Sequence, residues 1–212
     1  MSTWVKICGL SSREAVQAAA EAGADAVGFV FAESPRRVLP GEARRLCEGL
    51  DRRVVRVAVM RHPGPDEWAA VRDGFAPDWL QTDAADFATL ELPDACARLP
   101  VYRDDNAGLT SRSTEIPARF LFEGARSGTG QRADWSAAAA LAPRAELVLA
   151  GGLSPDNVEE ALAAVAPWGV DVSSGVERAP GYKDPARIAA FVERVRRWDR
   201  RATESRSRTQ DE

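Results

Sequence analysis

A lysine and a cysteine lie two residues apart in the segment VKICGL, at residues 5–10. The segment is typical of a buried strand that ends in a glycine-marked turn. Because strand side chains alternate in direction, Lys6 and Cys8 share one face. At the mouth of a barrel, a thiol that can act as a base would then lie beside a positive charge. A free cysteine near a strand end is more often a small buried apolar side chain, so this pair alone identifies no site.

Other expected strands are also followed by groups that bind or react. These segments are Ser34-Pro35-Arg36-Arg37, Gln81-Thr82-Asp83, Glu123 with Ser127-Gly128-Thr129-Gly130, Gly151-Gly152-Leu153-Ser154-Pro155 and Asp171-Val172-Ser173-Ser174-Gly175. Glycine amides and helix N-termini bind phosphate, so the last two segments predict a phosphate site. The candidate phosphate ligands are Gly152, Ser173, Ser174, Gly175 and, in a less specific motif, Gly130. The alternative is that these glycines only form tight turns.

Arg36 and several carboxylates are candidates for substrate binding and proton transfer. Arg36 follows a proline-fixed loop, where a guanidinium is suited to bind a carboxylate through two hydrogen bonds; a solvated surface arginine is an equal alternative. The only histidine, His62, is expected at the surface, in a polar turn before a proline. Proton transfer would then fall to Cys8 and to carboxylates. The candidate carboxylates are Glu123, Asp83 and Asp171.

Alternating strands and helices must position these groups. Strands are expected at residues 5–10, 24–32, 53–60, 79–81, 100–102, 119–123, 146–150 and 169–173. Helices are expected at 12–22 with Ser11 and Glu14 as a capping box, and at 40–50, 65–75, 84–99, 134–141, 155–165 and 185–198. Eight such repeats predict an α/β fold, a single-domain (β/α)8 TIM barrel over residues 1–199, with its active site at the carboxyl ends of the strands. The polar residues 200–212 are expected to be a disordered tail.

Composition excludes several classes of partner. The formal net charge is −4 and the pI is about 5.3, so no positive field favours nucleic acid or an anionic membrane. No segment approaches the roughly 20 apolar residues of a membrane span and no leader is recognisable, so a cytoplasmic protein is expected. Cys8, Cys47 and Cys96 form no close pair and there is one histidine, so no metal site is expected.

Five segments together resemble the phosphoribosylanthranilate isomerase family of tryptophan biosynthesis in order and spacing: VKICGL, GADAVGFVFAESPRRV, SGTGQRADWS, LAGGLSPDNVEEAL and GVDVSSGVERAPGYKD. The resemblance runs from about Val5 to Phe191. It implies an Amadori rearrangement of N-(5′-phosphoribosyl)anthranilate to 1-(2-carboxyphenylamino)-1-deoxyribulose 5-phosphate, without cofactor or metal. It also implies that Cys8 is the general base, that Arg36 holds the anthranilate carboxylate, and that the glycine-rich loops hold the phosphate. Separately, a monomer or homodimer is expected.

Three positions depart from the pattern of that family. Glu123 stands where the family has an aspartate as general acid, Asp83 where it has a histidine, and Arg103 where it has a lysine. As an acid, Glu123 needs a pKa raised by burial or by like charge, and a nearby carboxylate at Asp83 can supply the like charge. Whether Lys6 lowers the pKa of Cys8 or is neutralised by Asp171 stays open. The departures also keep two alternatives open: a diverged isomerase of another phosphoribosyl amine, and a non-catalytic barrel that binds phosphosugars.

Overall fold

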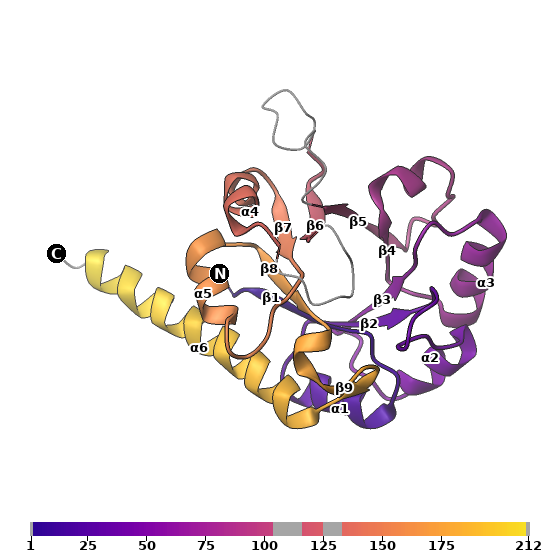
Figure 1. Ribbon diagram of the computed structural model, residues 1–212, viewed down its shortest axis with the longest axis horizontal. Coiled ribbons are helices and arrows are strands. Elements are labelled where there is room, and N and C mark those ends of the chain that lie inside the picture. Colours follow the sequence, from indigo (N-terminus) through magenta and orange to yellow (C-terminus); the bar gives the residue numbers. More distant parts are fainter. Residues whose placement is uncertain (1, 104–115, 125–132, 211–212) are drawn as a thin grey trace.

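The protein folds into a closed barrel of eight parallel strands (Figure 1). This computed structural model describes residues 2–103, 116–124 and 133–210, with 205–210 described by their backbone only. The strands are β1 (Trp4–Cys8), β2 (Ala26–Val30), β3 (Val55–Val59), β4 (Trp79–Asp83), β5 (Ala97–Arg103), β6 (Arg119–Glu123), β7 (Glu146–Leu149) and β8 (Gly169–Val172). Each pairs with its neighbour in sequence, and β8 closes the barrel on β1. The predicted (β/α)8 fold is confirmed.

Helices on the outside of the barrel connect most of the strands. They are α1 (Arg13–Glu21), α2 (Pro40–Leu46), α3 (Pro65–Phe75), α4 (Trp135–Leu141), α5 (Val158–Val165) and α6 (Pro185–Gln210). Short 3₁₀ helices occupy Ala84–Ala88, Ala142–Arg144 and Ser174–Val176, and a hairpin of β9 (Glu177–Ala179) and β10 (Tyr182–Lys183) follows the last of them. None of the described helices is both long and apolar enough to cross a membrane.

Two expected helix starts and one expected helix are wrong. The N-cap of α1 is Ser12, whose hydroxyl accepts a hydrogen bond from the Ala15 amide, rather than Ser11. The helix expected at 155–165 begins only at Val158. Residues 84–99 form a short 3₁₀ helix and then enter β5. Pro93 accounts for the last difference, because it lacks an amide hydrogen and disfavours helical geometry in the residue before it.

The last helix is longer than the sequence led us to expect. Asp184 caps it as predicted, by accepting hydrogen bonds from the amides of Ala186 and Arg187. It then continues past Trp198 to Gln210 and extends beyond the barrel in Figure 1. Residues 199–210 contain no glycine or proline, so no strong local signal ends the helix. The division into a barrel and a disordered tail at residue 199 stays a prediction.

Aromatic side chains close the amino-terminal end of the barrel. The ring of Trp4 stacks on those of Trp79 and Trp168, with centroids 5.2 and 5.3 Å apart. The guanidinium of Arg119 lies 4.5 Å from the ring centroid of Trp79 and 4.6 Å from that of Trp168, and it pairs with Glu146. Such cation–π contacts stabilise partly buried rings. Because this end is packed shut, the opposite end of the barrel is the place for a site.

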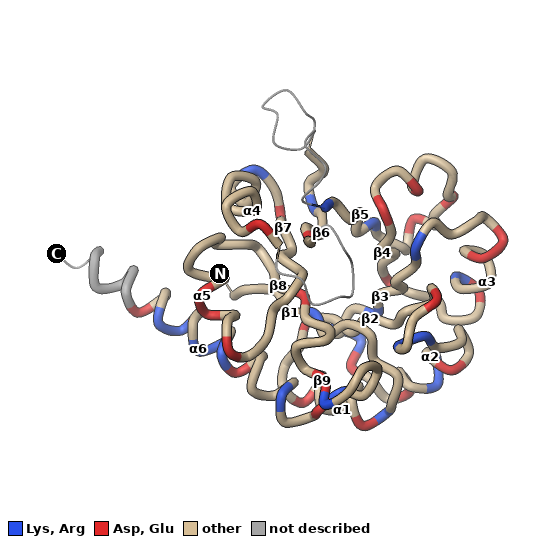
Figure 2. Tube along the Cα trace, viewed as in Figure 1, with Lys and Arg blue, Asp and Glu red and all other residues tan. Residues whose placement is uncertain are grey.

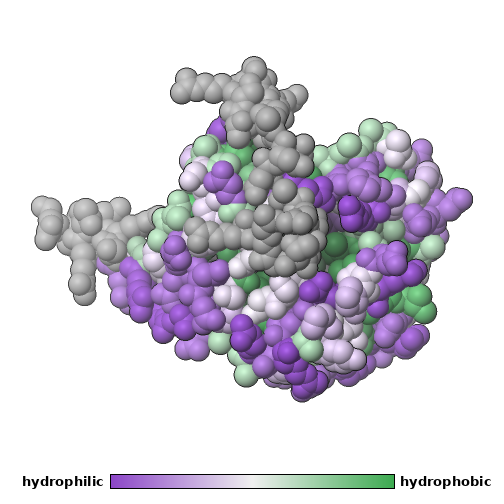
Figure 3. Space-filling view, in the orientation of Figure 1, coloured by the Kyte–Doolittle hydropathy of each residue, from purple (hydrophilic) through white to green (hydrophobic). Residues whose placement is uncertain are grey.

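Charged residues of both signs are mixed along the described part of the chain. Figure 2 shows basic and acidic residues interspersed along α6 and over the other helices. The face in Figure 3 is mainly hydrophilic, with apolar patches that are small and separate. This mixture agrees with the modest net charge of −4 and gives no support to a nucleic-acid partner.

Candidate active site

A cavity of about 190 Å³ lies at the carboxyl ends of the strands. Most of the predicted site residues line it: Cys8 from β1, Arg36 after β2, Asp83 from β4, Glu123 from β6, Asp171 from β8 and Ser173 after β8. Arg103 from β5 also lines it. The barrel therefore gathers these groups from positions up to 165 residues apart in the chain, as the alternation of strands predicted.

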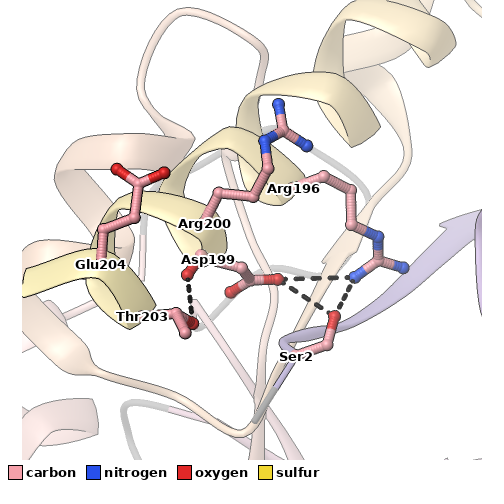
Figure 4. A pocket seen from close by; sticks show the side chains of 6 residues that line it. All are labelled: Ser2, Arg196, Asp199, Arg200, Thr203 and Glu204. Atoms are coloured by element: carbon pink, nitrogen blue, oxygen red, sulfur yellow. Dashed lines mark hydrogen bonds and ion pairs between the residues drawn. The ribbon is translucent and has the colours of Figure 1, made fainter. Parts of the chain in front are cut away.

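A second, more open cavity of about 520 Å³ lies beside α6 near the start of the chain (Figure 4). Arg196 donates a hydrogen bond to the hydroxyl of Ser2, and that hydroxyl donates to Asp199. Asp199 also accepts hydrogen bonds from the amide and hydroxyl of Thr3. These contacts tie the start of β1 to α6. They lie at the amino-terminal end of the barrel, where side chains contribute to stability rather than to catalysis.

Lys6 and Cys8 point into the barrel side by side, as predicted. Both contact the bare backbone of Gly28 on β2, where an added Cβ atom would lie 3.0 Å from Lys6 Cε and 3.1 Å from Cys8 Sγ. Lys6 is fully buried, and its Nζ donates to Asp171 Oδ1 at 2.7 Å. Burial acts to lower the pKa of Lys6, but the charge and hydrogen bond of Asp171, with a smaller contribution from Cys8, raise it overall. Lys6 is therefore an ammonium ion that interacts favourably with both Asp171 and Cys8.

Cys8 is a thiol rather than a thiolate in the free protein. Burial raises the pKa of this thiol above its ordinary value, and the nearby charge of Asp171 adds to the effect. The positive charges of Lys6 and Lys183 oppose the rise without cancelling it. The sequence left open whether Lys6 lowers the pKa of Cys8 or is neutralised by Asp171. Both effects occur, because the ammonium pairs with Asp171 and still favours the thiolate of Cys8.

Slow alkylation of Cys8 at neutral pH is the first expected result. Only the thiolate is nucleophilic, and a raised pKa lowers the thiolate fraction at any pH below it. The rate of reaction with iodoacetamide should be lower than that of free cysteine at about pH 7 and should increase as the pH rises. Peptide mass spectrometry separates Cys8 from Cys47 and Cys96, whose pKa values burial raises to about 11. Reaction of Cys8 as fast as free cysteine at pH 7 would contradict this assignment.

Loss of Asp171 should destabilise the barrel strongly. Asp171→Asn leaves the ammonium of Lys6 buried without its partner, which costs roughly 3–5 kcal/mol of unfolding free energy for a buried ion pair. Urea unfolding followed by tryptophan fluorescence measures the change. The double variant Lys6→Met/Asp171→Asn removes both charges and is the matched control. It should lose less stability than the single variant, and an equal or larger loss would show that the charge imbalance is not the cause.

Arg103 links the two carboxylates on the other side of the cavity. One guanidinium nitrogen lies 2.6 Å from Asp83 Oδ1, and another lies 3.3 Å from Glu123 Oε1. The expectation that Asp83 acts on Glu123 as a like charge therefore does not describe the geometry, because a cation contacts both carboxylates. Arg103 was noted in the sequence only as a replacement for lysine. Its planar fork, which can serve two acceptors at once, is the property that this arrangement uses.

His62 extends this network to the surface. Its side chain is 61% exposed, as expected for a surface residue. Its Nε2 lies 3.2 Å from Asp83 Oδ2 and its Nδ1 lies 3.0 Å from Asp86 Oδ1. Among the residues that the structure describes, these three form the group whose ligand atoms could hold a metal ion, within 4.8 Å of one another. Both ring nitrogens already face carboxylates and Arg103 pairs with Asp83, so nothing here argues for a metal, and its absence stays a prediction.

Arg36 is held in place by an acidic residue that the sequence did not reveal. Its Nε and one terminal nitrogen donate to the two oxygens of Glu177 at 2.7 and 2.9 Å. The side chain is only 11% exposed, so the alternative of a solvated surface arginine is wrong. Sequence reasoning missed Glu177 because it lies several residues after the eighth strand, in a hairpin. The alternation of strands and helices does not predict that hairpin. Arg36 also lines the cavity, where a guanidinium is suited to bind a carboxylate.

The loops after β7 and β8 lie against each other, as a shared phosphate site would require. An added Cβ atom on Gly175 would lie within 3 Å of Leu153 and Ser154 backbone atoms, so only glycine allows this close approach. The side chain of Asn157 fixes the first loop by accepting from the Ser154 amide and donating to the Gly152 carbonyl.

Among the candidate phosphate ligands, Ser173 lines the cavity. Ser174 begins the 3₁₀ helix that follows. Residues 125–132, including Gly130, lie outside the described part of the chain. Phosphate binding by these loops stays a prediction.

Comparison with known proteins places these features in a family. The family model described as N-(5′-phosphoribosyl)anthranilate (PRA) isomerase matches residues 5–194. The N-(5′-phosphoribosyl)anthranilate isomerase of Xanthomonas euvesicatoria pv. vesicatoria (strain 85-10) is 42% identical, over 93% of this chain and 95% of that protein. The protein of the same name from Bordetella avium (strain 197N) is 39% identical, over 94% of this chain and 98% of that protein.

Solved structures agree. Phosphoribosyl anthranilate isomerase from Thermus thermophilus superposes with a TM-score of 0.78 at 32% identity, over 91% of this chain and 98% of that one. A phosphoribosyl anthranilate isomerase in complex with reduced 1-(o-carboxyphenylamino)-1-deoxyribulose 5-phosphate gives a TM-score of 0.73 at 32% identity, over 92% and 98% of the two chains. Since the barrel, the motifs and the similarity extend over nearly the whole length, the chain belongs to the N-(5′-phosphoribosyl)anthranilate isomerase family.

Proposed function

We propose that this protein is an active N-(5′-phosphoribosyl)anthranilate isomerase of tryptophan biosynthesis. The observation that carries the proposal is that Cys8, Arg36 and Glu123, from different parts of the barrel, line one cavity at the carboxyl ends of the strands. A base, an acid and a carboxylate-binding arginine are the groups that the reaction needs. The relatives that share this fold and length are named for that activity.

The reaction is an intramolecular redox isomerisation of the aldose–ketose type. A general acid protonates the furanose ring oxygen, the ring opens, and the anthranilate nitrogen forms a Schiff base at C1. A base then removes the proton from C2, and the resulting enolamine tautomerises to the ketone. C1 is reduced while C2 is oxidised, so the atoms and electrons balance within the substrate. This balance agrees with the expectation that no cofactor takes part.

Each step of this reaction is assigned to a residue according to its position in the barrel. Cys8 acts as the base at C2, and Lys6 beside it stabilises the thiolate that must form for this step. Glu123 acts as the acid at the ring oxygen, from β6, which is separated from β1 by β7 and β8. Arg36 binds the anthranilate carboxylate. Ser173, Ser174, Gly152 and Gly175, with Gly130, bind the phosphate, so that the sugar lies between base and acid.

A diverged isomerase that acts on another phosphoribosyl amine is the second candidate. The specific observation in its favour is the linked set Asp83, Arg103 and Glu123, which differs from the family at three positions on one side of the cavity. A non-catalytic phosphosugar-binding barrel is the third candidate. It predicts binding of phosphate esters without turnover.

A fluorescence assay that follows the loss of phosphoribosylanthranilate tests the proposal. The expected result is turnover by the wild-type protein and a loss of roughly 10²- to 10⁴-fold in Cys8→Ala. Turnover of a different phosphoribosyl amine in place of phosphoribosylanthranilate would favour the diverged isomerase. Binding without turnover of any such substrate would favour the non-catalytic barrel. A cytoplasmic location and a monomeric or homodimeric state accompany the proposed function as predictions.

A further inference from the structure

The hairpin of β9 and β10 lies beside the cavity and carries two buried charged residues without an assigned role. Lys183, one of only two lysines in the chain with Lys6, has a side chain that is 1% exposed, and the side chain of Glu177 is 5% exposed. Buried charges are costly to retain unless they are paired and hydrogen-bonded. Their positions near two candidate substrate-binding groups call for a physical explanation.

Lys183 connects Glu177 to the loop after β8. Its Nζ donates to Glu177 Oε1 at 2.7 Å, to the Ser173 carbonyl at 2.9 Å and to the Ser173 hydroxyl at 3.2 Å. These three acceptors match the three hydrogens of an ammonium group. Glu177 in turn accepts the two hydrogen bonds from Arg36. A continuous chain of contacts therefore runs from Arg36 through Glu177 and Lys183 to Ser173.

The backbone holds Arg36 and Ser173, the two ends of this series of contacts, close together. An added Cβ atom on Gly9 would lie 2.6 Å from Arg36 Cδ and 3.1 Å from Ser173 Oγ, so both side chains converge over the turn after β1. The hairpin packs directly on the loop that carries Arg36, because a Cβ atom on Gly181 would lie 2.5 Å from the Pro35 carbonyl oxygen. Ser11 also donates a hydrogen bond to the carbonyl of Gly181.

The protonation states of Glu177 and Lys183 are consistent with these contacts. Burial acts to raise the pKa of Glu177, but the hydrogen bonds and charges of Arg36 and Lys183 lower it below its ordinary value. The carboxylate is therefore ionised and serves two cations. Burial lowers the pKa of Lys183, and the hydrogen bond to Glu177 opposes this effect. One anion between two cations leaves a single positive charge in excess on this side of the cavity.

We propose that Glu177 and Lys183 are positioning residues that hold the carboxylate-binding arginine and the phosphate-binding loop as one unit. Glu177 fixes the plane of the Arg36 guanidinium, and Lys183 ties Glu177 to Ser173. The distance between the two anion-binding points is then set before the substrate arrives. This inference rests on the proposed roles of Arg36 and Ser173.

Glu177→Gln distinguishes positioning from a simple charge effect, because the two have opposite signs. Removing a negative charge beside Arg36 would by itself strengthen the binding of anions. Releasing the guanidinium from its fixed orientation weakens the binding of a carboxylate, since a binding group that is not held in place must be ordered when the ligand binds. We expect KM to increase at least about tenfold, with a smaller change in kcat. Tighter binding or an unchanged KM would overturn the proposal.

Lys183→Met tests the connection to the loop after β8. We expect weaker binding of both inorganic phosphate and anthranilate, each measured separately by calorimetry. Glu177→Gln should weaken anthranilate binding more than phosphate binding. Arg178→Met is the matched control, since it removes an exposed positive charge from the same hairpin. Equal effects of Lys183→Met and Arg178→Met would show that net charge alone is responsible and would refute positioning.

The fragment measurements keep this inference separate from the proposed function. If wild-type protein does not turn over phosphoribosylanthranilate, anthranilate and inorganic phosphate still report on the two ends of the site. Weaker binding in both variants would then support positioning even though the activity is different. If the wild-type protein is active and both variants retain its KM and its fragment affinities, only the positioning role fails. Circular dichroism and thermal unfolding of each variant confirm that the measured protein is folded.

Discussion

Replacing Cys8 with alanine should lower kcat/KM for phosphoribosylanthranilate by roughly 10²- to 10⁴-fold, the usual contribution of a positioned general base. The thiol lies beside Lys6 in the cavity that Glu123 also lines, and the described lining of the cavity contains no histidine that could take its place. The effect should fall on kcat, because Cys8 is proposed to act on the C2 proton and not on the charged groups that bind the substrate. Steady-state fluorescence kinetics measure both constants.

Cys96→Ala is the matched control for Cys8→Ala. The two cysteines are buried to the same extent, with 7% of each exposed, but Cys96 packs in the core outside the strands rather than in the cavity. Its replacement should leave kcat and KM unchanged. Unfolding in urea should show similar small losses of stability for both variants, since each removes one small side chain. Retained turnover in Cys8→Ala would remove this residue from the mechanism.

Glu123→Gln should also reduce kcat by roughly 10²- to 10⁴-fold, because the amide cannot donate a proton to the ring oxygen as an acid does. Glu123→Asp is the more informative change. It restores the aspartate of the family pattern but withdraws the carboxyl group by one methylene, away from Arg103, which now lies 3.3 Å from Glu123 Oε1. Since Arg103 also pairs with Asp83, the structure favours a pocket built around the longer side chain. We expect Glu123→Asp to lose activity on the order of a hundredfold.

Two further variants separate the possible outcomes at position 123. Arg103→Lys restores the family residue, and the double variant Glu123→Asp/Arg103→Lys should recover part of the activity lost by Glu123→Asp alone. Such recovery is the signature of residues that act together. Full or increased activity in Glu123→Asp by itself would instead mean that the glutamate is a tolerated change with no compensating contacts.

The three positions expected to depart from the family pattern are connected by ion pairs in the structure. Asp83, Arg103 and Glu123 come from three neighbouring strands, β4, β5 and β6, and they pair with one another at the rim of the cavity. A negative charge added at Asp83 is balanced by Arg103, which can reach both carboxylates where a lysine offers a single point of charge. This explains how the site keeps an acid at the end of β6 while the residues around it differ.

Sequence patterns determined the local part of this protein. Runs of β-branched and apolar residues separated by capped helices predicted the eight strands and the barrel, and β6 matched its expected bounds, Arg119–Glu123. Strand alternation placed Lys6 and Cys8 on one face, and the position of Glu123 at a strand end placed it at the carboxyl rim. These inferences succeed because they depend on nearest neighbours in the chain, whose geometry the backbone fixes.

Tertiary structure decided which groups meet. Lys6 pairs with Asp171, Arg36 with Glu177, and His62 with Asp83, across separations that no local pattern encodes. Those partners depend on the register with which the barrel closes and on a hairpin outside the strand and helix repeat. The expected helix at 84–99 failed for a related reason, since the chain there follows Pro93 into β5. The sequence alone thus indicates which residues can do chemistry, while packing of distant segments decides the charge, orientation and protonation with which they do it.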